Sequence, residues 1–227
     1  SGKLSPDQRL VCNGRCDVGP RAAKRKCTKA HGPLNAAEAL AFSCNSFAYE
    51  AAKLAGPENV VLWARRFGIG ADPPPGRHGL ACRPSRVMEK TRWYPGEVYN
   101  LAIGKGETVT TLVALGTYGC ALATGRLAAP TYVEESDLPA EIRAGSDGGK
   151  VRDVGLSPEI RSVLFAGMLG CTELTGGTGR RAACSGIRVL AKTGTAVLTP
   201  DRKNALMLVL VPAEAPKYCI VCVIQDS

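Results

Sequence analysis

The spacing of apolar residues changes along this chain. In five stretches before residue 170 they recur at helical intervals, within residues 34–42, 46–55, 57–67, 109–123 and 156–168. Near the C-terminus they form aliphatic runs separated by short turns, at residues 187–198, 205–212 and 218–225. Such runs indicate antiparallel strands of one sheet with at least one covered face. This order, with helices first and strands last, predicts an α+β fold in which an antiparallel sheet is flanked by helices.

Local signals mark several helix ends. Asn35 and Glu38 have the spacing of a capping box, in which each side chain bonds to the other residue's backbone. Gly56 is expected to end one helix and Pro57 to open the next. The Gly- and Pro-dense residues 67–79 and the polar residues 134–153 are too poor in periodic apolar positions for regular structure, so we expect surface loops there.

Polar residues interrupt the first predicted strand. Lys192, Thr193, Gly194 and Thr195 stand between two aliphatic flanks. The lysine supplies a positive charge, the threonines supply hydroxyl donors, and the glycine lets another backbone approach closely. Such an edge suits a peptide with a free carboxylate. Taken alone, the motif also fits a surface strand with an incidental lysine and threonines.

A second polar motif lies between two predicted helices. Ser43 and Asn45 flank Cys44 at this junction, where a short loop can project both side chains from a rigid support. A serine hydroxyl near a lysine amine can relay a proton, and an Asn amide can hold a substrate amide. In isolation, the tripeptide is more simply explained as the N-cap of the following helix.

Composition excludes some classes of protein. The 227 residues are 45% hydrophobic with a mean hydropathy of −0.02, which is too apolar for a disordered chain. No apolar run approaches the roughly 18 residues of a membrane span, and no leader is expected in this sequence. The net charge of +9 suits nucleic acid, an acidic surface or a carboxylate-bearing substrate, or reflects only a solvated basic loop.

Ten cysteines are many for a chain of this size. The spacing of Cys12, Cys16, Cys27 and His31 could coordinate zinc, and with the neighbouring basic residues it could form a nucleic-acid-binding finger. The residues between Cys16 and Cys27 offer almost nothing apolar for a finger's core. A disulfide among Cys12, Cys16 and Cys27 that closes a basic loop is at least as good an explanation, so we expect a disulfide and no metal ligands.

The ordered set of motifs resembles the transpeptidase domain of class B penicillin-binding proteins, especially the elongation type. The resemblance covers nearly the whole chain. It rests on the stretches "GKLSPD", "HGPLNAAEALAFSCNSFAYEAAKLAG", "FGIG", "YNLAIGKGETVTTLVALGTYGCALATG", "LSPEIRSVLFAGML", "GGTGRRA" and "AKTGTA". The fold implied is that of the serine β-lactamases and transpeptidases, with residues 1–227 as a partial domain.

The resemblance implies roles for the two polar motifs. Ser43 would relay protons, Asn45 would hold the substrate's peptide amide, and Lys192 would supply charge and support the relay. Thr193 and Thr195 would bind the terminal carboxylate, and Gly194 would leave room for the peptide. The family's nucleophile lies in a Ser-x-x-Lys motif, and no serine of this sequence has a lysine three residues later. The family's final helix is also not matched.

The function implied is peptidoglycan cross-linking by serine acyl transfer in an intact protein tethered to the inner membrane, with this domain outside the cytoplasm. The expected partners are peptidoglycan stem peptides, β-lactams and cell-wall synthesis proteins, with no cofactor and no nucleic acid. Two alternatives stay open from the sequence. One is a catalytically silent scaffold or peptide-binding domain, and the other is a zinc-dependent nucleic-acid-binding module at residues 12–31.

Overall fold

The chain is described from a computed structural model, which covers residues 4–16, 25–70, 85–132, 137, 151–199 and 201–226. Much of the two predicted surface loops, residues 71–79 and most of 134–150, lies outside the described residues.

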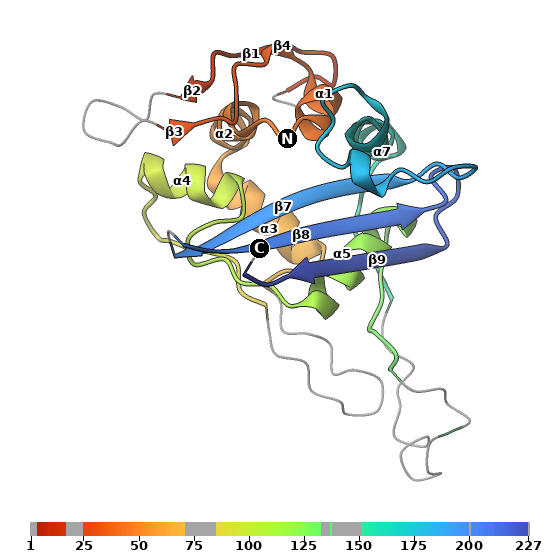
Figure 1. Ribbon diagram of the computed structural model, residues 1–227. Coiled ribbons are helices and arrows are strands. Elements are labelled where there is room, and N and C mark those ends of the chain that lie inside the picture. The colour runs from red at the N-terminus through yellow and green to blue at the C-terminus, as the bar shows by residue number, and fades with distance from the viewer. Residues whose placement is uncertain are drawn as a thin grey trace.

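An antiparallel sheet crosses the middle of the molecule (Figure 1). Its strands are β7 (Leu190–Thr199), β8 (Arg202–Val211) and β9 (Tyr218–Ile224), in the spatial order β7-β8-β9. The register pairs Lys192 with Leu208 and Leu208 with Val221. These strands match the three aliphatic runs, and the α+β prediction is confirmed.

One face of the sheet is covered by helices. α5 (Leu112–Thr124) packs on β8 and β9, and α7 (Pro158–Glu173) packs on β7. Gly119 allows the close approach of α5, because a Cβ there would lie only 2.4 Å from the sulfur of Cys219 on β9. The core between these layers is apolar and includes the fully buried Leu190 and Leu210. Burial of this apolar surface fixes the sheet against the helices.

Four further helices lie between the N-terminal strands and α5 in the chain and pack on one another or on α7. They are α1 (Ala36–Ala41), α2 (Asn45–Ala55), α3 (Pro57–Arg66) and α4 (Pro95–Ala102). The predicted capping box is present, since Asn35 Oδ1 accepts from the Glu38 N–H at 2.9 Å and Glu38 Oε2 accepts from the Asn35 N–H at 2.9 Å. Gly56 ends α2 and Pro57 opens α3, as expected. The sequence did not predict α4.

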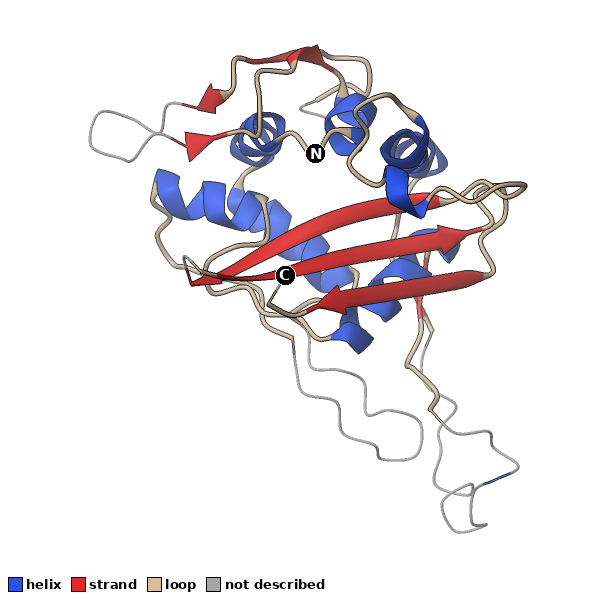
Figure 2. Cartoon of the chain, viewed as in Figure 1, coloured by secondary structure: helices blue, strands red, loops and turns tan. Residues whose placement is uncertain are grey.

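Short strands before α1 form an arm of two-stranded ladders, drawn in red at the top of Figure 2. β1 (Leu10–Cys12) pairs with β4 (Gly32–Leu34), and β2 (Arg15–Cys16) pairs with β3 (Arg25–Lys26). Farther along the chain, β5 (Arg126–Leu127) pairs with β6 (Arg152–Asp153), and a 3₁₀ turn, η2 (Arg180–Ala182), precedes β7. The arm brings residues near positions 12 and 31 side by side.

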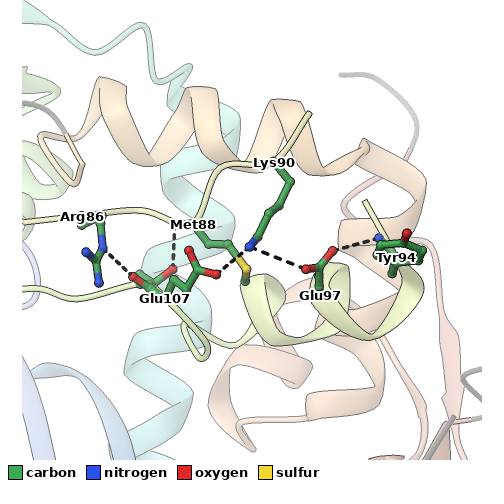
Figure 3. Close-up of polar contacts among 7 residues, drawn as sticks. Arg86, Met88, Lys90, Tyr94, Glu97 and Glu107 are labelled. Atoms are coloured by element: carbon green, nitrogen blue, oxygen red, sulfur yellow. Dashed lines mark hydrogen bonds and ion pairs between the residues drawn. The ribbon is translucent and has the colours of Figure 1, made fainter. Parts of the chain in front are cut away.

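A chain of surface ion pairs ties α4 to the segments around it (Figure 3). The Lys90 ammonium lies between the carboxylates of Glu97 on α4 and Glu107. Glu97 also accepts from the Tyr94 N–H at the start of α4. Exposed pairs of this kind stabilise little individually. The position of α4 therefore depends mainly on its packing against α2.

Within the described ranges, none of the helices combines the length and the apolar character needed to cross a membrane.

The outer edge of β9 has aggregation potential. Among the described residues β9 pairs only with β8, and Tyr218, Ile220 and Ile224 are more than half exposed. We expect the 227-residue polypeptide to associate through this edge, because unpaired backbone groups beside apolar side chains template strand addition. Size-exclusion chromatography with light scattering should show oligomers that Ile220→Lys reduces and that Leu62→Lys, at a similarly exposed position on α3, leaves unchanged. A monodisperse monomer of the unsubstituted chain would contradict the prediction.

Candidate active site

Ser43 lies in a tight turn between α1 and α2. Its φ of 53° is in the left-handed region, an unusual conformation for a residue with a side chain. The turn is held because the Cys44 N–H donates to the Ala39 carbonyl at 2.8 Å and Cys44, the N-cap of α2, accepts from the Phe47 N–H at 3.5 Å. The N-cap is therefore Cys44, and the Ser43 side chain remains available to another segment.

That other segment is β7. Lys192 Nζ donates to Ser43 Oγ at 2.8 Å and to the carbonyl oxygen of Thr193 at 2.7 Å. Burial lowers the pKa of Lys192. A partly desolvated amine in contact with a hydroxyl can pass a proton to or from that hydroxyl. The structure thus brings Ser43 and Lys192 together, although 149 residues separate them in the sequence.

Asn45 begins α2 on the side that faces the N-terminal arm. Its Nδ2 lies 3.5 Å from the Lys26 carbonyl, and its backbone N–H donates to the sulfur of Cys27 at 3.3 Å. The long side-chain contact is weak, so the amide retains most of its hydrogen-bonding capacity. Asn45 follows Ser43 by two residues in the chain, and it is half-buried.

The three residues after Lys192 lie on an edge strand. Among the described residues β7 pairs only with β8, and Gly194 and Thr195 are exposed. A Cβ at Gly194 would make only an ordinary contact with Leu206, 3.6 Å away, so packing within the chain does not require glycine there. The unpaired edge has room for an extended peptide. Thr193 Oγ1 lies 2.8 Å from the hydroxyl of Thr178, a residue that our sequence analysis did not select. The stretch "GGTGRRA" was its only signal.

A second cluster lies directly beside this site. The metal-binding atoms of Cys12, Cys27, His31 and Cys44 all lie within 4.8 Å of one another. Cys12 and Cys27 each place their sulfur 3.5 Å from His31 Nδ1, and the sulfurs of Cys27 and Cys44 are 3.8 Å apart. Three thiols and one imidazole at this spacing match the ligand set of tetrahedral zinc.

The surroundings of the cluster tune its thiols differently. Burial raises the pKa of Cys12, but its polar surroundings, with Ser46, His31 and Gly14 nearby, outweigh burial and lower the value to about 6. Burial raises the pKa of Cys44 to about 12, with the neighbouring sulfurs acting in the same direction. A metal ion would favour the thiolate form of every cysteine here.

The converging donor atoms differ from the sequence motif in one residue, Cys44 in place of Cys16. Cys16 lies elsewhere, with its thiol 3.7 Å from Glu50, and burial together with that carboxylate raises its pKa. Cys44 takes its place because the turn after α1 points the residue toward the arm. Cys12, Cys16 and Cys27 are free thiols in the structure. From the sequence we expect a disulfide and no metal ligands, whereas the cluster gives a reason to propose a metal.

Comparison with known proteins identifies the family of the chain. A family model described as the penicillin binding protein transpeptidase domain matches residues 1–227. The peptidoglycan D,D-transpeptidase PbpA of Mycolicibacterium smegmatis is 27% identical over 204 residues, which cover 84% of this chain and 38% of PbpA. The chain thus spans well under half of that relative.

Solved structures agree on the fold. Pseudomonas aeruginosa PBP2, in complex with WCK 5153, matches 100% of this chain and 52% of its own with a TM-score of 0.85 and 21% identity. The ceftriaxone acyl-enzyme complex of penicillin-binding protein A from M. tuberculosis matches 98% of this chain and 51% of its own, with a TM-score of 0.82 and 18% identity. Since the family model matches the full length, the chain belongs to the penicillin-binding protein transpeptidase domain family.

Proposed function

We propose that this chain forms part of a class B peptidoglycan D,D-transpeptidase whose Ser-x-x-Lys segment lies outside the 227 residues. The hydrogen bond from Lys192 Nζ to Ser43 Oγ, 2.8 Å long and next to an unpaired strand edge, carries the proposal. It joins a proton relay to a surface that can hold an extended peptide with a terminal carboxylate. Residues 1–227 are then a partial transpeptidase domain.

The reaction is acyl transfer. A serine hydroxyl attacks the carbonyl of the penultimate D-Ala of a stem peptide, an ester forms, and the terminal D-Ala leaves as an amine. An amine from a neighbouring strand then attacks the ester, forms the cross-link and releases the serine. Each step needs a proton moved between the attacking and leaving groups.

Residues of this chain serve those steps. Ser43 and Lys192 carry the proton to the leaving amine, because their hydrogen bond already joins hydroxyl and amine. Thr193 and Thr195 bind the terminal carboxylate, and Asn45 holds the peptide amide. The backbone N–H of Thr195 contributes to the oxyanion hole, where one donor is worth on the order of 10²–10³ in rate.

The same site accounts for the proposed partners. A β-lactam carries a carboxylate and a strained amide, and a relative of this fold forms an acyl-enzyme with ceftriaxone. Stem peptides would be the substrates, in an extracytoplasmic compartment, with the intact protein tethered to the inner membrane and associated with cell-wall synthesis proteins. The silent-scaffold alternative keeps the fold and lacks the nucleophile.

Release of D-Ala separates these two functions. The longer protein that includes the Ser-x-x-Lys segment should release D-Ala from a stem peptide ending in D-Ala-D-Ala, and an added amine should divert the acyl group into a cross-linked product. Mass spectrometry follows both products. A folded protein that binds the peptide and releases no D-Ala would support the scaffold.

We also propose that Cys12, Cys27, His31 and Cys44 hold a structural zinc ion, because their donor atoms converge within 4.8 Å. Bound zinc would supply a fixed cross-link between the N-terminal arm and the turn that carries Ser43 and Asn45. The nucleic-acid alternative is not favoured, because residues 1–227 match the transpeptidase model throughout.

A zinc ion held by Cys12 and Cys27 and a disulfide between these two cysteines exclude each other, because zinc binds thiolates. We expect one zinc per chain by elemental analysis, and we expect Cys12→Ser to lose it and to lower the melting temperature by about 5–15 °C. Cys222→Ser, at an exposed cysteine outside the cluster, is the matched control. Zinc-free protein with a Cys12–Cys27 disulfide in unreduced digests would overturn the metal proposal and support the sequence-based expectation.

A further inference from the structure

The loop between α7 and η2 touches both halves of the candidate active site. We call residues 175–179 the threonine loop. The Thr178 N–H donates to the carbonyl of Ala41 at 3.3 Å, and Ala41 stands just before the Ser43 turn. The Gly179 N–H donates to the carbonyl of Cys171 at 2.9 Å, at the end of α7. The loop is therefore fixed to two helices before β7 begins.

Glycine permits this close seating of the loop. A Cβ at Gly177 would lie 2.4 Å from the Cys171 carbonyl oxygen and 2.5 Å from the Gly170 carbonyl oxygen. Contacts that short are excluded sterically, and the atoms concerned are helix backbone that cannot move aside cheaply. The position of the next residue, Thr178, is thus determined by backbone packing.

The Thr178 hydroxyl lies at the centre of a small hydrogen-bonded group. Its oxygen is 2.8 Å from Thr193 Oγ1, 3.2 Å from the sulfur of Cys171 and 3.4 Å from the Ala41 carbonyl oxygen. The Cys171 thiol is fully buried, whereas Thr178 is exposed on the side of the substrate edge. The group therefore runs from the protein interior to the surface at Thr193.

The direction of these hydrogen bonds depends on what Thr193 binds. A threonine hydroxyl has one proton to donate and can also accept. Without a ligand, Thr193 can donate to Thr178, and Thr178 to the Ala41 carbonyl. A carboxylate only accepts, so Thr193 must then donate its proton to the carboxylate. Thr178 can rotate to donate to Thr193 while it accepts from the Cys171 thiol.

We propose that Thr178 is a positioning residue that orients the Thr193 hydroxyl toward the substrate's carboxylate, as the middle member of the chain Cys171–Thr178–Thr193. This inference rests on the proposed transpeptidase function. Reversing the direction of the Thr178–Thr193 hydrogen bond requires only rotation of hydroxyl and thiol groups, so no net proton is transferred. Donors linked in this head-to-tail order polarise one another and strengthen the final hydrogen bond to the anion.

The test uses the longer protein with its Ser-x-x-Lys segment and a fluorescent penicillin. Time-resolved labelling at several concentrations separates the dissociation constant of the initial complex from the acylation rate constant. The variants are Thr178→Val, which keeps the shape and removes the hydroxyl, Thr178→Ser, which keeps the hydroxyl, Thr193→Val and the Thr178→Val/Thr193→Val pair. Thermal melting of each variant checks that the fold is retained.

We expect Thr178→Val to raise the dissociation constant about three- to tenfold, the value of one hydrogen bond, with the acylation rate constant changed less than twofold. Thr178→Ser should restore wild-type binding. In the Thr193→Val background, Thr178→Val should have no further effect, since Thr178 acts through Thr193. A penicillin whose carboxylate is masked as a neutral ester should bind the wild type and Thr178→Val equally.

Other outcomes would overturn the inference. Unchanged binding in Thr178→Val would show that the hydroxyl is not used. An equal loss in the Thr193→Val background would show that Thr178 acts independently of Thr193, and an equal loss with the ester would show a general distortion of the site. Wild-type protein that is never labelled would instead refute the proposed function, and the inference with it.

Discussion

Replacing Lys192 by alanine should slow acylation by penicillin about 10²–10⁴-fold in the longer protein that carries the Ser-x-x-Lys segment, the range typical of lost acid–base catalysis. The change removes the amine that donates to Ser43 Oγ at 2.8 Å and interrupts the proton relay. It also removes the positive charge from the edge where Thr193 and Thr195 meet a carboxylate, so binding should weaken as well.

The measurement is gel fluorescence with intact-mass detection over time. Lys217→Ala, at an exposed lysine before β9, is the matched control and should label at the wild-type rate. Lys192→Arg separates the two roles, because a guanidinium keeps the positive charge but does not give up its proton. Acylation by this variant should remain slow, whereas its binding of penicillin should recover in part. Full labelling of Lys192→Ala would show that β7 is not the substrate edge.

The elements that the sequence predicted are those set by local chemistry. The capping box at Asn35 and the boundary at Gly56 and Pro57 depend on residues within one turn of each other, and all of them appear in the structure. The three strands could be predicted because aliphatic runs make up most of β8 and β9 and both flanks of the polar motif in β7. α4 (Pro95–Ala102) escaped detection because Tyr94 stands at its N-cap, where Asn35 marks the start of the still shorter α1 by a residue type typical of that position.

The geometry of the candidate active site could not be predicted from the sequence, because it depends on contacts between residues far apart in the chain. Ser43 and Lys192 were selected as motifs, but only the fold places them 2.8 Å apart. The cysteine motif suggested Cys16, whereas the turn after α1 brings Cys44 to Cys12 and Cys27. Spacing along the chain cannot show which of several cysteines a later helix delivers to a site.

The 227-residue polypeptide itself should form no covalent adduct with penicillin. No serine in it is followed three residues later by lysine, so the family's arrangement of nucleophile and base is not encoded within these residues. Within the part of the chain that the structure describes, Ser43 is the one serine that hydrogen-bonds to Lys192, and two features argue against its attack. Lys192 also donates to the Thr193 carbonyl, and Ser43 accepts from Lys192. Both contacts suit an ammonium that donates protons rather than a base that removes one.

Intact-mass spectrometry after incubation with penicillin tests this directly, in parallel with the longer protein. The 227-residue polypeptide should keep its mass, and the longer protein should gain the mass of one β-lactam per chain. If the shorter polypeptide were labelled, the Ser43→Ala variant would show whether Ser43 is the labelled residue. Labelling that Ser43→Ala abolishes would make Ser43 the nucleophile, with Lys192 as its base, because the 2.8 Å hydrogen bond would then carry the serine's proton in the opposite direction.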